Sequence, residues 1–169
     1  RAGGDARTAL SVAIVTKRCY DNLRPSGVKV HAGTLLLVPG LTEKDFDEIH
    51  ALGIKLVKFI FYDYSLLPNG EAERYVNWAH ARGIKVKIHS GGVSRSGLSQ
   101  MCGYDILSWL KPDIAAHISG GPIPMSDADL DRVIDETSFA LEVCTSGNYG
   151  STKRAVERHI NGIFVKLDL

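Results

Sequence analysis

The sequence has 169 residues, of which 44% are hydrophobic, and its 20 lysines and arginines almost balance its 19 acidic residues. A chain of this length normally forms one domain with its own core, and its near-neutral charge gives no reason to expect a nucleic-acid partner. No apolar run approaches the ~20 residues of a membrane span, so we expect no membrane association.

The three cysteines, Cys19, Cys102 and Cys144, are widely spaced, odd in number and contain no CxxC pair. This pattern suits a reducing compartment better than a disulfide framework, so we expect a cytoplasmic protein.

Apolar periodicity and turn residues predict alternating helices and strands along the chain. Thr42 and Asp45 have the spacing of a capping box at a helix start, and Gly53 and Gly83 stand where helices should end. The expected helices are residues 5–23, 42–52, 69–82, about 100–110, 126–136 and from 151 onward. The expected strands are residues 27–31, 54–62, 84–89, 113–117 and 139–143.

Five strands that are each followed by a helix predict a parallel sheet covered by helices. Two architectures remain at this point, a doubly wound sheet and a piece of a (β/α)8 barrel. A doubly wound sheet is covered on both faces, and its strands tend to read as continuous apolar runs. The distribution of polar and apolar residues over the two faces of each strand therefore distinguishes the doubly wound sheet from the barrel.

Alternation along the strands favours the barrel. In "IKVKIH", Val86 and Ile88 oppose Lys87 and His89. In "VKVH", the valines oppose His31 in the same way, and in "DIAAH" Ile114 and Ala116 oppose His117. One face is apolar and the other repeatedly carries polar groups. A full barrel needs ~250 residues. We therefore expect residues 1–169 to form a single incomplete domain, about strands three to seven of a (β/α)8 barrel.

Histidines end two consecutive predicted strands, and glycine pairs follow them. His89 precedes Gly91-Gly92, and His117 precedes Gly120-Gly121. The carboxyl ends of barrel strands are where active sites lie, and an inward imidazole there can ligate a metal. A hydrogen-bonded core histidine is the other interpretation of each residue alone.

Lys58 lies inside "KLVKFIFY", where a buried ammonium group would cost several kcal/mol. Three explanations are open at this stage. Lys58 pairs with a carboxylate, acts uncharged as a Schiff-base amine, or takes up CO2 to become a carbamate that bridges two metals.

Several stretches together resemble the amidohydrolase superfamily of binuclear metal hydrolases, and within it the enamidases. They are "RPSGVKVHAG", "GLTEKDFDEI", "VNWAHARGIKVKIHSGG", "KPDIAAHISGGP" and "DRVIDETSFALEV". In addition, "GIKLVKFIFY" is similar to the Gly-Ile-x-x-x-Lys strand of the hydantoinases. The resemblance extends over nearly the whole chain.

The resemblance implies a metal centre and a reaction. Lys58, carboxylated and bridging, would join His89 and His117 as ligands of a divalent metal, zinc or zinc with iron. A metal-activated water would hydrolyse a small-molecule cyclic amide or a related C–N bond. Asp168 is the available stand-in for the family's final catalytic Asp, and His31 is a candidate for orienting substrate or a ligand.

The HxH pair of the family's first strand is absent, and no Gly-x-Asp turn surrounds Asp168. We therefore expect the sequence to be an internal fragment that does not hydrolyse alone, from a parent enzyme that is a homo-oligomer. Two alternatives stay open, a Schiff-base lyase that uses Lys58 and a non-catalytic truncated metal-binding remnant.

Overall fold

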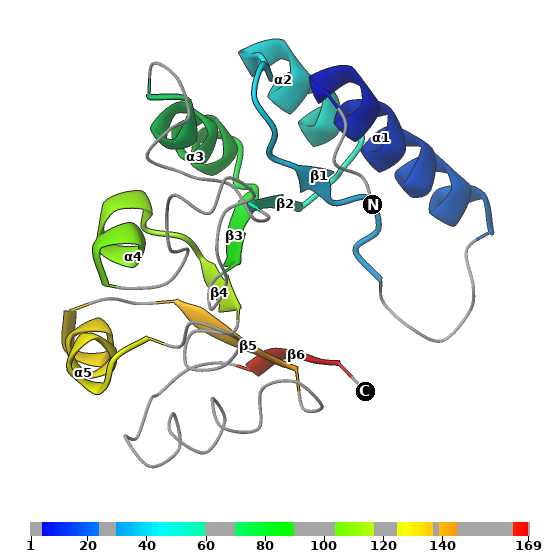
Figure 1. Cartoon of the computed structure of the whole chain (residues 1–169). Coiled ribbons are helices and arrows are strands. Elements are labelled where there is room, and N and C mark those ends of the chain that lie inside the picture. The colour runs from blue at the N-terminus through cyan, green and yellow to red at the C-terminus, as the bar shows by residue number, and fades with distance from the viewer. Residues whose placement is uncertain are drawn as a thin grey trace. The chain divides into compact units, whose positions relative to one another are not determined.

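A computed structural model describes residues 5–23, 30–59, 70–89, 104–116, 125–136, 139–144 and 164–168. Helices and strands alternate along them (Figure 1). The helices are α1 (Ala6–Leu23), α2 (Glu43–Ala51), α3 (Glu71–Ala81), α4 (Tyr104–Leu110) and α5 (Asp127–Glu136). The strands are β1 (Leu35–Leu36), β2 (Leu56–Phe59), β3 (Lys85–His89), β4 (Ile114–Ala116), β5 (Ala140–Cys144) and β6 (Phe164–Asp168).

The six strands are neighbours in chain order within one sheet, and β1–β2, β3–β4, β4–β5 and β5–β6 pair in parallel. A helix lies between each two successive strands from β1 to β5. The prediction of a parallel sheet built from repeated strand and helix units is confirmed. Residues 1–60 and 68–86 form one compact unit, and residues 61–67 and 87–169 form a second.

Two strand predictions need correction. Residues 30 and 31 lie outside any strand, and the first strand is instead Leu35–Leu36. The strand Phe164–Asp168 was not predicted at all. Residues 27–29 and the helix expected from 151 lie outside the described residues.

Local signals explain where the helices begin and end. The Asp45 carboxylate accepts a hydrogen bond of 2.6 Å from the Thr42 amide, so the capping box at the start of α2 is confirmed. At the ends of α2 and α3, Gly53 and Gly83 have φ angles of 75° and 65°. This left-handed conformation is available to glycine at little cost, and it directs the chain from each helix into the next strand.

The core of the first unit lies between its strands and the helices α2 and α3. Val57 and Phe59 of β2 are fully buried, as are Phe46 of α2 and Tyr75 of α3. The Tyr75 hydroxyl accepts a hydrogen bond from the Leu41 amide at 3.1 Å, so this large side chain is buried without an unsatisfied polar atom.

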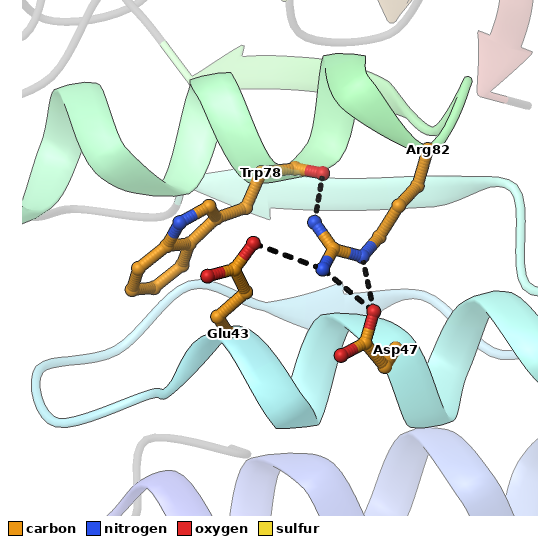
Figure 2. A network of polar contacts seen from close by, with 4 residues as sticks. All are labelled: Glu43, Asp47, Trp78 and Arg82. Carbon is orange, nitrogen blue, oxygen red and sulfur yellow. Dashed lines mark hydrogen bonds and ion pairs between the residues drawn. The ribbon is translucent and has the colours of Figure 1, made fainter.

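Arg82, directly after α3, joins α3 to α2 (Figure 2). Its guanidinium donates to one oxygen of Asp47 from Nε at 2.8 Å and from Nη2 at 2.6 Å, to Glu43 at 3.1 Å and to the Trp78 carbonyl at 3.0 Å. The Arg82 side chain is 13% exposed, whereas Glu43 and Asp47 are 57% and 63% exposed. Arg82 is therefore the ordered centre of this contact.

Replacing Arg82 should weaken the first unit. We expect Arg82→Ala to lower the free energy of unfolding by about 1 kcal/mol, because charge-assisted hydrogen bonds are lost but their acidic partners can return to water. Arg82→Lys should recover only part of this, since a lysine lacks the planar fork. Urea denaturation measures both, with Arg18→Ala on the exposed side of α1 as control. Equal midpoints for Arg82→Ala and Arg18→Ala would contradict this role.

Candidate functional site

Burial alternates along β2, as the sequence indicated, whereas in β3 Lys87 is buried together with its neighbours Val86 and Ile88. Val86 and Ile88 of β3 are fully buried, whereas Lys85 is exposed and His89 is half-buried. We call the face of β3 that carries Lys85, Lys87 and His89 the polar face. His89 is the last residue of β3, so it stands at the carboxyl end of its strand, as predicted.

Lys58 also alternates with buried neighbours, but it is itself half-buried. Leu36 of β1 is its register partner, and the Leu37 amide donates to the Lys58 carbonyl at 2.9 Å. The structure therefore shows Lys58 as partly rather than fully buried. Partial exposure lowers the cost of a charged amine, so burial alone gives no reason for altered chemistry at this residue.

The buried lysine is Lys87 instead. Lys87 is 7% exposed, and its ammonium group forms an ion pair with Glu142 of β5, which is 4% exposed. The sequence interpretation missed both residues. Glu142 stands between Leu141 and Val143 within a predicted strand. An acidic residue between two apolar residues of a strand could have indicated a buried carboxylate that needs a cationic partner.

The strand pairing explains how this ion pair forms across β4. His89 is in register with Ala116, which is in register with Glu142, and Lys87 is in register with Ile114. Residues in register on parallel strands share a face, so Ile114 and Ala116 lie on the polar face. The small Ala116 side chain leaves Lys87 room to reach Glu142.

This register corrects the faces assigned to β4. Ile114 and Ala116 were expected to face the helices, opposite His117, but they share the face of His89. His117 itself lies outside the described residues, and its role as a ligand stays a prediction.

The structure places Asp168 at a strand end, as a site residue requires, but it does not place His31 in a strand. Asp168 ends β6 in register with Cys144, the last residue of β5, so its backbone lies at the carboxyl ends of the strands. His31 is exposed and precedes β1 without belonging to a strand, so the strand alternation that directed it toward the site is absent. Its role in orienting substrate stays a prediction.

The described residues contain no group of three His, Cys, Asp or Glu side chains placed to hold a metal ion. The ligands predicted from the sequence are Lys58, His89 and His117. The absence of such a group does not test them as a set, because Lys58 is not one of these residue types and His117 lies outside the described residues. Imidazoles at His89 and His117 and a carbamate at Lys58 would together suit a divalent metal such as zinc or iron. None of the described helices is long and apolar enough to cross a membrane.

No protein-family model matches the sequence. The chain is 41% identical to enamidase from Eubacterium barkeri over 144 residues, which is 85% of this chain and 37% of enamidase. The crystal structure of enamidase, described as a new member of the amidohydrolase superfamily, matches with a TM-score of 0.79 and 37% identity. That match covers 99% of this chain and 44% of the enamidase chain.

A FabK mutant from Thermotoga maritima matches with a TM-score of 0.50 and 13% identity over 92% of this chain and 49% of that chain, which shows a shared fold alone. The chain is thus related to the amidohydrolase superfamily, and its fold class is a partial (β/α)8 barrel, as predicted. The chain resembles enamidase, and it spans less than half of that protein's length.

The Lys87–Glu142 pair gives a sharp stability test. Lys87→Met or Glu142→Leu alone should cost about 3–5 kcal/mol of unfolding free energy, because each leaves one buried charge without its partner. The double variant should cost less than either single change, since no unpaired charge remains. Urea denaturation of the four proteins measures the coupling. Additive losses would show that the two charges do not depend on each other.

Proposed function

We propose that this chain belongs to a metal-dependent hydrolase that opens a cyclic amide or a related non-peptide C–N bond of a small molecule. The similarity to enamidase at 41% identity is the observation that carries this proposal. The place of His89 at the carboxyl end of β3 supports it, because barrel enzymes place their reacting groups at this end of the sheet.

In this proposal, His89, His117 and a carboxylated Lys58 hold the metal, zinc or zinc with iron. The bound metal would lower the pKa of a water and polarise the substrate carbonyl. Neutral imidazole nitrogens donate to the metal, and the carbamate of Lys58 would replace a cation with an anion. Asp168 is the candidate to accept a proton from the attacking water, and His31 is the candidate to orient the substrate.

The Lys87–Glu142 pair would support this centre from the same face of the sheet. The pair carries no net charge, so it would not repel a divalent cation at His89. Both side chains are buried, so the pair is itself shielded from water. We assign the pair a positioning role because neither charged group is exposed enough to meet a substrate.

We further propose that the protein is cytoplasmic and that the parent enzyme is a homo-oligomer. The cysteine pattern supports the first point, and Cys19 is a free, exposed thiol. Size-exclusion chromatography with light scattering tests the second point, and a monomeric parent enzyme would contradict it.

Zinc content of the purified 169-residue chain tests the ligand assignment. We expect weak binding of at most one zinc, lost in His89→Ala and His117→Ala, because a single site with few ligands cannot spare an imidazole. Lys58→Ala should change the zinc content little, since its carbamate would need bridging metals to persist. His50→Ala, on the exposed side of α2, is the matched control. Zinc retained by both strand-end variants would contradict the assignment.

Activity separates the hydrolase from the two alternatives. In a protein that joins these residues to an HxH pair, a chelator should abolish hydrolysis of a cyclic amide, and added zinc should restore it. Borohydride trapping of a carbonyl substrate on Lys58 would instead identify a Schiff-base lyase. A metal-loaded protein without hydrolysis of any cyclic amide would favour the non-catalytic remnant.

A further inference from the structure

The second unit contains a pocket of about 450 Å³ lined by residues of α4, by the last residue of α5 and by residues that follow these helices. It lies beside Pro112 and Phe139, directly before β4 and β5 begin. The candidate metal ligands are placed at the carboxyl ends of the strands, so this pocket is at the opposite end of β4 and β5. Its volume lies in the range of small-molecule sites.

Lys111 lines this pocket in an unusual backbone conformation. Its φ angle is 47°, and it is the one described residue other than glycine with a positive φ. The chain uses Gly53 and Gly83 in the same left-handed conformation after α2 and α3. A residue with a Cβ is disfavoured there, so a lysine at this position points to a use for its side chain.

Tyr104 and Glu136 also line the pocket, and they contact each other. The Tyr104 hydroxyl donates to the Glu136 carboxylate, which raises the pKa of the tyrosine and keeps it protonated. The Arg132 guanidinium lies 3.6 Å from the centroid of the Tyr104 ring, and its Nε is 3.9 Å from Glu136. Arg132 therefore offsets the charge of Glu136.

Among the described residues that line the pocket, Lys111 supplies the positive charge. It is exposed, and no acidic side chain among the described residues forms an ion pair with it. Its backbone is held in place by a hydrogen bond of 3.0 Å from its amide to the Leu107 carbonyl. Leu107, Pro112 and Phe139 form the apolar part of the lining, and Tyr104, Ser108 and Glu136 contribute to a polar part of similar extent.

We propose that this pocket binds a small organic carboxylate with a flat apolar ring. The carboxylate meets the ammonium group of Lys111, and the ring lies against Leu107, Pro112 and Phe139. An exposed ammonium group gives affinity for the anion, and the apolar walls select for the ring. This site is separate from the proposed metal centre and does not depend on hydrolase activity.

Benzoate and its neutral isostere benzamide are the probes. In calorimetric titration of the purified chain we expect saturable binding of benzoate, with benzamide and acetate each at least about tenfold weaker. Lys111→Gln keeps the backbone and removes the charge, so it should weaken benzoate about tenfold and leave benzamide unchanged. Lys44→Gln, an exposed lysine on α2, should bind benzoate as the unaltered chain does.

Lys111→Gly separates the backbone from the side chain. Glycine suits the left-handed conformation, so the midpoint of thermal unfolding should rise by about 2–4 °C while benzoate binding is lost. Equal affinity for benzoate and benzamide would overturn the proposal, as would unchanged benzoate binding in Lys111→Gln. A lower unfolding midpoint for Lys111→Gly would overturn the inference from strain.

Discussion

Each strand of this sheet must bury one face against helices, and this constraint determines where polar chemistry can lie. The helix-facing side chains of β2 and β3 are fully buried, among them Val57, Phe59, Val86 and Ile88. Polar side chains are therefore confined to the other face, where Lys58 and His89 alternate with these residues. Because parallel strands present their carboxyl ends at one edge, the same constraint brings chemistry-bearing residues to that edge.

The buried pair of Lys87 and Glu142 is the second constraint within the polar face. A buried ion pair is seldom more stable than apolar side chains of the same size, so stability alone does not account for its presence. His89 and Glu142 occupy the same level of the sheet, separated by Ala116. The pair adds polar groups to the face that carries His89 without adding net charge, whereas apolar replacements would remove these polar groups.

Sequence reasoning succeeded where a local signal had a single physical meaning. The capping box at Thr42 and the left-handed glycines after α2 and α3 are such signals. It failed at β1, because a strand of two residues has no alternation to detect. Ala115 and Ala116 are both fully buried, so the apolar pattern of β4 does not distinguish its faces. Alternation along a strand predicts which face a side chain lies on, but it does not predict how deeply that side chain is buried. For this reason the sequence pointed to Lys58 as the buried lysine, whereas the structure buries Lys87.

The central claim is that the strand ends hold a divalent metal through His89 and His117. Zinc K-edge X-ray absorption of the zinc-loaded chain measures this directly, because imidazole ligands give a distinct scattering pattern. We predict two imidazoles per zinc in the unaltered chain and one in His89→Ala under forced loading. A zinc shell without imidazole, or one that His89→Ala leaves unchanged, would contradict the account.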